Sequence, residues 1–256
     1  MLALIGMGLG TGDVSAGAID FMSTASRVYV ERYTAVVDQQ TINSIAGMIG
    51  KEIAELQRAD MEDNLKETVK LAKAEDVAIL VSGDPLVATT HHIIVDEAAS
   101  QGIKTRIFHS SSIFSAAIGE SGLDIYRFGP PVTIPYWSEK YRPASFLDAI
   151  KRNMANNFHT MLLLDINQAE KRPMSLREAI ETIQSAQKQS GVDAFGDETR
   201  LLIMGDVGKE GQRIIYTALV SAMRLENEFH DKMLAIIAPA NPNFAESEAI
   251  SKFQKV

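Results

Sequence analysis

Gly83-Asp84-Pro85-Leu86-Val87-Ala88-Thr89-Thr90-His91 is the stretch of this sequence that says most about its fold. It directly follows residues 79–81, an apolar segment typical of a buried β-strand. Gly83 permits a sharp exit from that strand, and Pro85 is suited to begin the next turn. Asp84 is placed either to point its carboxylate into a ligand site or to cap the following helix. The stretch therefore predicts a strand, a tight turn and then a helix.

Short apolar strands and helical segments alternate on both sides of this stretch. Strands are expected at residues 2–6, 28–31, 79–81, 105–108, 160–164, 200–204 and 233–238. Helices are expected along the apolar stripe of Met61, Leu65, Val69 and Ala72, over residues 91–100, from the capping box of Ser175 and Glu178 to about Lys188, and from about Phe244. This alternation is typical of α/β domains with a largely buried sheet.

Glycines and prolines interrupt this pattern between residues 119 and 137. Gly122, Gly129, Pro130, Pro131 and Pro135 lie there, and a continuous helix or a central strand does not accommodate them. We place a domain junction in this segment. The sequence thus predicts two α/β domains of similar size, residues 1–125 and 126–256, with a cleft between them as the default ligand site.

The composition limits the possible functions. The chain has 256 residues, of which 46% are hydrophobic and 23% charged, values typical of a globular protein. Its net charge of −8 argues against a nucleic-acid groove, which requires a basic surface. No apolar run approaches the roughly 20 residues that cross a bilayer, and the first residues do not resemble a signal peptide. With no cysteine, a disulfide, a thiolate zinc site and a cysteine nucleophile are excluded, and a cytoplasmic protein is expected.

A glycine-rich loop, Gly6-Met7-Gly8-Leu9-Gly10-Thr11-Gly12, follows the first expected strand and invites comparison with dinucleotide-binding loops. The spacing does not fit, because the third glycine of that fingerprint would fall on Thr11 when counted from Gly6 and on Asp13 when counted from Gly8. A carboxylate at Asp13 would also repel a pyrophosphate. Two interpretations remain: a tight turn that needs glycine, and a loop that lets a ligand without phosphates approach the backbone closely.

Six segments resemble, in order along the chain, the signatures of one family. They are Leu4-Ile5-Gly6-Met7-Gly8-Leu9-Gly10, Glu31-Arg32-Tyr33-Thr34, residues 83–91, His109-Ser110-Ser111-Ser112-Ile113, residues 122–129 and residues 159–166. On these segments the chain resembles the diphthine synthases, which belong to the tetrapyrrole-methylase-like class of S-adenosylmethionine-dependent methyltransferases. The resemblance covers nearly the whole chain, is most specific at residues 83–91 and is looser beyond Ile166.

The resemblance implies a fold, a cofactor and a substrate. The fold would be two α/β domains of the tetrapyrrole-methylase type in a homodimer. S-adenosyl-L-methionine would bind in the cleft between the domains and leave as S-adenosyl-L-homocysteine. The substrate would be translation elongation factor 2, whose aminocarboxypropyl-modified histidine would be N-methylated successively to diphthine, a step of diphthamide biosynthesis. Nucleic-acid and membrane partners are not expected.

The resemblance also implies a set of cofactor-binding residues. They are Leu9, Asp84, Val87, Ser112, Ile113, Leu163, Met204 and Asn243. A carboxylate at Asp84 suits the ammonium group of the cofactor's methionine portion, and Ser112 is placed to bind its carboxylate at a helix N-terminus. Two positions depart from the family, since Gly205-Asp206-Val207-Gly208 replaces its Ala-Arg-x-Gly and Asn243 stands where it has a histidine.

No catalytic residue and no metal site is assigned from the sequence. An α-amino group has an unperturbed pKa of roughly 7.7–8.0, so losing its proton near neutrality costs only about 1 kcal/mol against the roughly 7–11 kcal/mol that positioning supplies. Positioning should dominate, with water taking the proton. The pair His92 and Asp96, four residues apart, fits a helix-surface hydrogen bond better than a metal site. Asp165 remains either an acceptor-site carboxylate or a turn cap.

Three alternative functions stay open at this point. The first is a methyltransferase of the same fold that acts on a carbon atom of a corrin or porphyrin precursor. The second is a nicotinamide-dependent oxidoreductase that uses the Gly6 to Gly12 loop. The third is an interaction module that binds no cofactor.

Overall fold

The computed structural model describes residues 1–32, 35–61, 63–167 and 170–254. The chain divides into two compact units, Met1–Ile113 and Phe114–Val256. The division falls earlier than the expected junction at residue 125. The intervening segment contacts the second unit, where the backbone N–H of Asp124 donates to Glu246 (3.0 Å).

The first unit is built on a parallel five-stranded sheet in the order β3-β2-β4-β1-β5. Its strands are β1 (Leu2–Gly6), β2 (Arg27–Glu31), β3 (Ala54–Leu56), β4 (Val77–Val81) and β5 (Thr105–Phe108). β1 and β4 are buried at every position, because each lies between two other strands and both faces of the sheet are covered. This confirms the predicted apolar strands of this unit.

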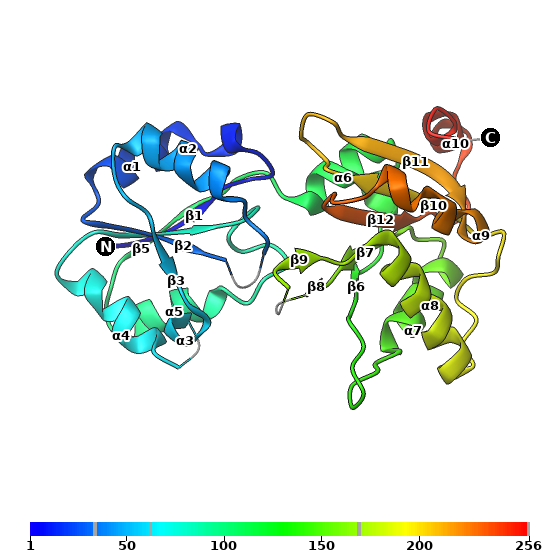
Figure 1. The fold of residues 1–256 in the computed structure, drawn as a ribbon, viewed down its shortest axis with the longest axis horizontal. Coiled ribbons are helices and arrows are strands. Elements are labelled where there is room, and N and C mark those ends of the chain that lie inside the picture. Colours follow the sequence, from blue (N-terminus) through cyan, green and yellow to red (C-terminus); the bar gives the residue numbers. More distant parts are fainter. Residues whose placement is uncertain (33–34, 62, 168–169, 255–256) are drawn as a thin grey trace. The chain divides into compact units, whose positions relative to one another are not determined.

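Helices cover both faces of this sheet (Figure 1). On one face lie α1 (Ala16–Thr24) and α2 (Gln39–Ile49), and on the other lie α3 (Arg58–Met61), α4 (Leu65–Lys70) and α5 (His92–Ser100). Phe21 and Ile45 pack in the first layer, and Val69 and Ile94 pack in the second. The single helix expected along the stripe from Met61 to Ala72 is instead divided into α3, α4 and the 3₁₀ turn η2 (Leu71–Lys73).

The parallel strands bring three of the signature segments to one edge of the sheet. The segments after β1, β4 and β5 start at residues 7, 82 and 109, and all leave from the carboxyl ends of the strands. In open α/β sheets, ligands bind outside these carboxyl ends. The first unit therefore offers a candidate site at this edge.

The second unit contains a mixed five-stranded sheet in the order β11-β10-β12-β7-β6 and a small hairpin of β8 and β9. The strands are β6 (Val132–Ile134), β7 (Thr160–Leu164), β8 (Ile166–Asn167), β9 (Arg172–Pro173), β10 (Arg200–Gly205), β11 (Arg213–Ala218) and β12 (Leu234–Ala238). β6 lies at the sheet edge, so Pro130, Pro131 and Pro135 can flank it without removing hydrogen bonds from the sheet.

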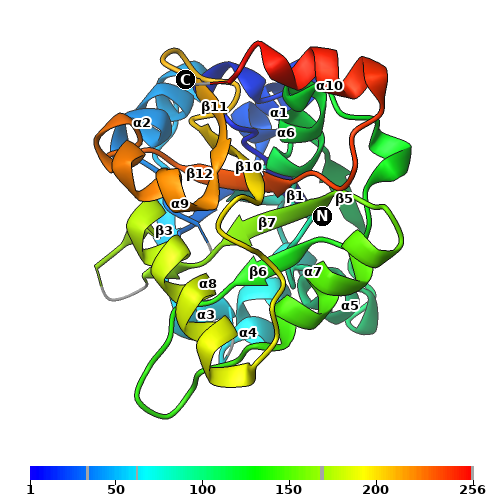
Figure 2. The ribbon, with the colours of Figure 1, turned by 90° about the vertical axis from the view of Figure 1, so that its right-hand side faces the viewer.

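Helices also cover both faces of the second sheet (Figure 2). One face carries α6 (Ile113–Ser121) and α10 (Phe244–Ser251), and the other carries α7 (Ser145–Ala155) and α8 (Leu176–Ser190). The short elements η3 (Ile125–Arg127), α9 (Leu219–Ala222) and η4 (Met223–Glu228) complete this unit. α8 begins with the predicted capping box, in which Ser175 and Glu178 each bond to the other's backbone.

Across the described residues, no helix combines the length and the apolar character needed to cross a membrane.

Candidate functional site

Asp84 is a nearly buried carboxylate at the carboxyl end of β4, with 7% of its surface exposed. Its Oδ1 accepts a hydrogen bond from Leu86 N–H (3.0 Å), which closes the turn, and its Oδ2 accepts one from Ser110 N–H (3.3 Å). His109 Nδ1 lies 2.7 Å from the same Oδ2. Burial alone would raise the pKa of Asp84, but the hydrogen bonds outweigh it and hold that pKa below its usual value. Asp84 is therefore ionised at neutral pH.

His109 is the replaceable partner of Asp84. Its side chain is 66% exposed, whereas the backbone donors of Leu86 and Ser110 belong to fixed turns. A cationic ligand group could take the place of the imidazole on Oδ2 without disturbing the core. Asp84 thus closes its turn through Oδ1, while Oδ2 remains able to bind a ligand group in place of His109.

The glycine-rich loop packs directly against the turn after β4. Gly8 and Gly83 exchange both of their backbone hydrogen bonds (3.1 and 3.0 Å), and both have positive φ angles (+69° and +66°). A Cβ atom on Gly8 would lie 2.6 Å from Asp13 Oδ2, and one on Gly6 would lie 2.6 Å from the Gly83 carbonyl oxygen. Gly6 and Gly8 thus allow the two loops to touch, as the tight-turn interpretation requires.

Asp13 occupies the backbone donors that this loop would offer to a phosphate. Its Oδ2 accepts hydrogen bonds from Leu9 N–H (2.8 Å), Gly10 N–H (3.2 Å) and the Ser111 hydroxyl. The Ser110 hydroxyl donates to the Asp13 carbonyl oxygen (2.8 Å), which ties the loop after β1 to the loop after β5. A pyrophosphate would have to displace a carboxylate of the same charge, so the geometry opposes the oxidoreductase alternative.

Five of the eight predicted cofactor-binding residues lie on these three neighbouring loops. Leu9 follows β1, Asp84 and Val87 follow β4, and Ser112 and Ile113 follow β5. Val87 is exposed, Leu9 and Ile113 are half-buried, and Ser112 is buried. The structure therefore brings together residues that are more than 100 positions apart in the sequence, and the bonds of Asp13 and Asp84 hold the loops in place.

Leu163 and Met204, in the second unit, lie in one row across its sheet. Both are in register with Ala235 of the strand between them, β12. Leu163 is half-buried, whereas the Met204 side chain is fully buried and presents no surface to a ligand in this structure.

Asn243, the last predicted cofactor residue, caps α10. Its side chain accepts a hydrogen bond from Glu246 N–H (3.0 Å), and Glu246 in turn accepts one from Asn243 N–H (2.8 Å). This capping box gives Asn243 a structural role at the start of the helix. The Asn-x-x-Glu spacing was visible in the sequence, but its importance comes from the other partners of Glu246.

Glu246 is the centre of a buried ion network in the second unit. Its carboxylate pairs with the Arg127 guanidinium and accepts a hydrogen bond from His159 Nε2 (3.0 Å). Arg127 also donates to the Ala240 and Asn241 carbonyl oxygens (3.2 and 3.1 Å). The network fixes the signature segment of residues 122–129 to the start of α10.

His159 is held as a neutral imidazole in this network. Its Nδ1 accepts a hydrogen bond from Ala240 N–H (2.9 Å), so that nitrogen has no room for a proton, while Nε2 donates to Glu246. Burial lowers the pKa of His159 below its usual value and outweighs the opposing effect of Glu246. Burial alone would raise the pKa of Glu246, but the bonds from Asn243 and His159 lower it to about 2.

We expect the stability of the second unit to fall as the pH is lowered, in two windows. The unfolded chain binds a proton at His159 below about pH 6.5, whereas the folded chain does so only at lower pH. Glu246 stabilises the folded state above about pH 4.5, and that contribution is lost as the pH falls toward about 2. Urea unfolding at a series of pH values measures both. A Glu246→Gln variant should lose less stability in the lower window, to which Glu178 of the same unit also contributes, and an unchanged profile in that variant would contradict the assignment.

Two further sequence expectations concern polar residues. Asp206, where the family has arginine, pairs with Lys232 (2.9 Å) and accepts a hydrogen bond from Met233 N–H (3.1 Å). Asp165 accepts hydrogen bonds from Tyr136 N–H (2.9 Å) and Ile166 N–H (2.8 Å), which supports its interpretation as a turn cap.

No metal site is apparent in the part of the chain that the structure describes: it contains no group of three or more His, Asp or Glu side chains arranged to hold an ion.

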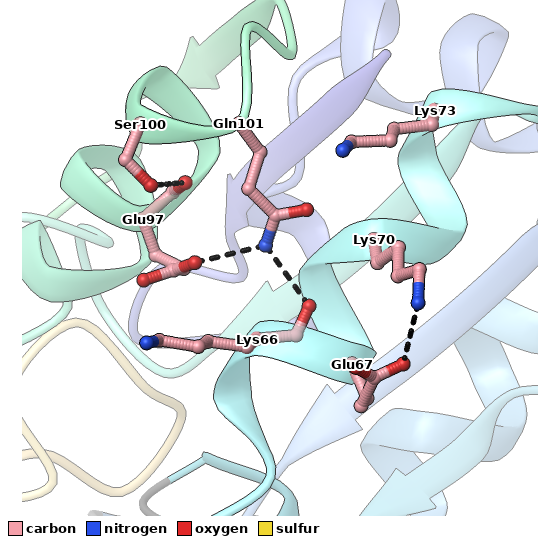
Figure 3. Close-up of a pocket in the computed structure, with 7 residues that line it drawn as sticks. All are labelled: Lys66, Glu67, Lys70, Lys73, Glu97, Ser100 and Gln101. Carbon is pink, nitrogen blue, oxygen red and sulfur yellow. Dashed lines mark hydrogen bonds and ion pairs between the residues drawn. The ribbon is translucent and has the colours of Figure 1, made fainter.

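An open depression of about 490 Å³ lies between α4 and α5 (Figure 3). It is lined by Lys66, Glu67, Lys70, Lys73, Glu97, Ser100 and Gln101. Several of these side chains bond to one another, as Lys70 does to Glu67 (3.2 Å) and Gln101 does to Glu97 (2.8 Å). All of its lining residues are polar or charged and none is aromatic or aliphatic, so we do not assign the cofactor, with its adenine ring, to this depression.

Comparisons with known proteins agree with the fold. The tetrapyrrole (corrin/porphyrin) methylase family matches residues 1–222. A diphthine synthase from Methanothermobacter thermautotrophicus is 34% identical over 249 residues, 97% of this chain and 93% of the relative. A diphthine methyl ester synthase from Mus musculus is 33% identical over 275 residues, 99% of this chain and 96% of the relative. A crystal structure of a diphthine synthase matches with a TM-score of 0.86 at 30% identity, covering 99% of this chain and 95% of that one.

The chain therefore belongs to the tetrapyrrole methylase family and is a methyltransferase with an α/β fold. Within that family it resembles diphthine synthases and a diphthine methyl ester synthase over nearly their full length, and the enzyme is of the diphthine synthase type. The family resemblance read from the sequence is confirmed.

Proposed function

We propose that this enzyme uses S-adenosyl-L-methionine to N-methylate the aminocarboxypropyl-modified histidine of translation elongation factor 2, and that it does so successively to form diphthine. The family membership supports the reaction, and the buried carboxylate of Asp84 supports the cofactor. We further propose that the enzyme acts as a homodimer in the cytoplasm, as the family resemblance implies.

The three loops of the first unit fit such a cofactor. A Cβ atom at Gly6 or Gly8 would collide with neighbouring loops. The backbone at these glycines therefore packs closely against those loops without side chains between them. Asp84 offers a carboxylate for the ammonium group once His109 moves aside, and Asp13 keeps phosphate-bearing nucleotides away from Leu9 and Gly10. When bound, the cofactor supplies a methyl group activated by a sulfonium, whose positive charge disappears as the methyl leaves. The loops bind and orient the cofactor, and this positioning contributes most to lowering the activation barrier.

Replacing Asp84 with alanine is expected to weaken cofactor binding by about 2–5 kcal/mol, a loss of affinity of roughly 30-fold or more, because a nearly buried carboxylate is removed from an ammonium group. Calorimetric titration with S-adenosyl-L-methionine measures the effect. Asp96, exposed on α5 of the same unit, provides the control Asp96→Ala. Unchanged affinity in a folded Asp84→Ala protein would contradict the proposed cofactor site.

Mass spectrometry of precursor-bearing elongation factor 2, incubated with the enzyme and cofactor, tests the reaction itself. We expect added methyl groups that survive mild alkali, since N-methyl groups are stable and methyl esters are not. An alkali-labile methyl group would instead indicate the additional ester that the name of the mouse relative describes. Methyl transfer to a tetrapyrrole precursor but not to elongation factor 2 would favour the alternative function.

A further inference from the structure

Some residues of two signature segments have no part in the cofactor site described above. One begins at Glu31, and its Tyr33 and Thr34 lie outside the described residues. The other is the Thr89-Thr90-His91 end of the segment that follows β4. Glu31 ends β2 and His91 precedes α5, so both lie near the carboxyl edge of the parallel sheet. The structure places these two residues, 60 positions apart, against each other.

Thr89, His91 and Glu31 form a buried row of hydroxyl, imidazole and carboxylate. Thr89 Oγ1 lies 2.7 Å from His91 Nδ1, and His91 Nε2 lies 3.5 Å from Glu31 Oε2. The side chains of His91 and Glu31 are at most 1% exposed. Across the described part of the chain, His91 Nε2 is the buried side-chain nitrogen or oxygen that lacks a hydrogen-bond partner. An unsatisfied nitrogen beside a buried carboxylate indicates a group with a chemical role, because buried polar atoms are normally paired.

The order of the three groups allows the row to accept a proton. If the Thr89 hydroxyl donates to Nδ1, the ring proton is on Nε2 and faces Glu31. A second proton arriving at Nδ1 makes the ring an imidazolium, and Glu31 stabilises that charge. In catalytic triads, hydroxyl, imidazole and carboxylate stand in this order, and the imidazole removes the proton of the hydroxyl while the carboxylate stabilises the imidazolium.

The outer end of the row is partly exposed and lies in the same loop as Asp84 and Val87. Thr89 is half-buried, and Val87, two residues before it, is exposed and belongs to the expected cofactor-binding set. Ala88 between them has φ of +55°, a left-handed conformation that non-glycine residues rarely adopt. Strained backbone of this kind persists where surrounding contacts enforce it and is concentrated at functional sites.

We propose that Thr89, His91 and Glu31 form a proton-accepting chain that deprotonates the acceptor amine before each methyl transfer. The proposal rests on the proposed N-methylation, in which every transfer requires a neutral nitrogen. An N–H bond of the ammonium breaks as an O–H bond forms at Thr89 Oγ1. The original Thr89 proton passes to His91 Nδ1, Nε2 keeps its proton, and the imidazolium pairs with Glu31. The proton returns through Thr89 to water before the next cycle. Thr89 is the catalytic residue of the chain, whereas His91 and Glu31 act through it.

The pH dependence of methyl transfer tests this chain. Thr89→Val removes the hydroxyl at constant shape, and we expect turnover to fall about tenfold near pH 6.5 and to match the wild type near pH 9, where the amine is already neutral. Thr89→Ser should restore the wild-type profile, and Thr90→Val, at the exposed neighbouring threonine, is the matched control. The cofactor affinity measured by calorimetry should stay within about twofold of the wild-type value in all three variants, because a role limited to proton transfer does not change cofactor binding. A Thr89→Val profile parallel to the wild type, whether equally active or uniformly reduced, would overturn the proposal.

A second measurement does not depend on activity. Nitrogen-15 NMR of the histidine-labelled wild-type protein should show His91 with its proton on Nε2 and none on Nδ1, and a proton on Nδ1 of the neutral ring would overturn the proposal. If wild-type enzyme methylates no elongation factor 2 at any pH, the proposed function fails and this role fails with it. If the wild type is active and only the pH-dependent loss in Thr89→Val is missing, the chain alone is refuted.

Discussion

Replacing Glu246 with alanine is expected to destabilise the second unit by about 3–5 kcal/mol, because breaking a buried ion pair leaves its partners uncompensated. The change would remove the carboxylate from both Arg127 and His159 and would also remove an acceptor from the Asp124 and Asn243 backbone. Urea denaturation measures the loss. The single tryptophan, Trp137, belongs to the second unit and packs on its core, so its fluorescence reports on that unit.

Glu248 gives the control for this experiment. It lies on the same helix, is exposed and carries the same charge, so Glu248→Ala should change stability by less than about 0.5 kcal/mol. Equal effects of the two substitutions would show that the buried network is not what stabilises this unit.

Replacing Gly8 with alanine is expected to abolish measurable cofactor binding. The new Cβ would lie 2.6 Å from Asp13 Oδ2 and 2.7 Å from Ser111 Oγ, and the backbone at φ +69° already disfavours any side chain. The left-handed conformation alone costs roughly 1–2 kcal/mol for a residue other than glycine. Relieving the collision must separate Asp13 from Leu9 and Gly10, which displaces the loop that carries Leu9.

Gly10→Ala is the matched control in the same loop, since a Cβ atom there would have no neighbour within 4 Å. Calorimetry with S-adenosyl-L-methionine should therefore find near wild-type affinity for Gly10→Ala and none for Gly8→Ala. Equal affinities would mean that the loop after β1 does not contact the donor.

The central strands were predicted because their environment is uniform. β1, β4 and β12 are central, and most of their residues are buried, so each reads as an apolar run. β3 and β6 are three-residue edge strands, too short to carry a pattern, and were not predicted. α2 was missed because residues 39–49 contain Thr41, Asn43 and Gly47, which favour helix weakly. The helix forms because Asp38 caps its start and its apolar residues pack on the sheet.

The candidate site was predictable where its chemistry is local. The Gly83-Asp84-Pro85 turn and the unsuitability of Asp13 for a phosphate loop could both be read from neighbouring residues. The pairs Asp13 with Ser111 and His159 with Glu246 are 98 and 87 residues apart, so no spacing in the sequence reveals them. Asp84 and His109 are nearer but lie in loops that follow different strands, β4 and β5, and only the sheet order brings these loops together.

The carboxylate of Asp13 also affects the entropy cost of binding the cofactor. Since it satisfies the amides of Leu9 and Gly10 from within the chain, that loop is held in shape without a ligand. The loop therefore loses little conformational entropy when the cofactor binds, because it is already preorganised. A related enzyme that bound a phosphorylated nucleotide through this loop would need a different residue in place of Asp13. It would then also lose the contacts that preorganise the loop.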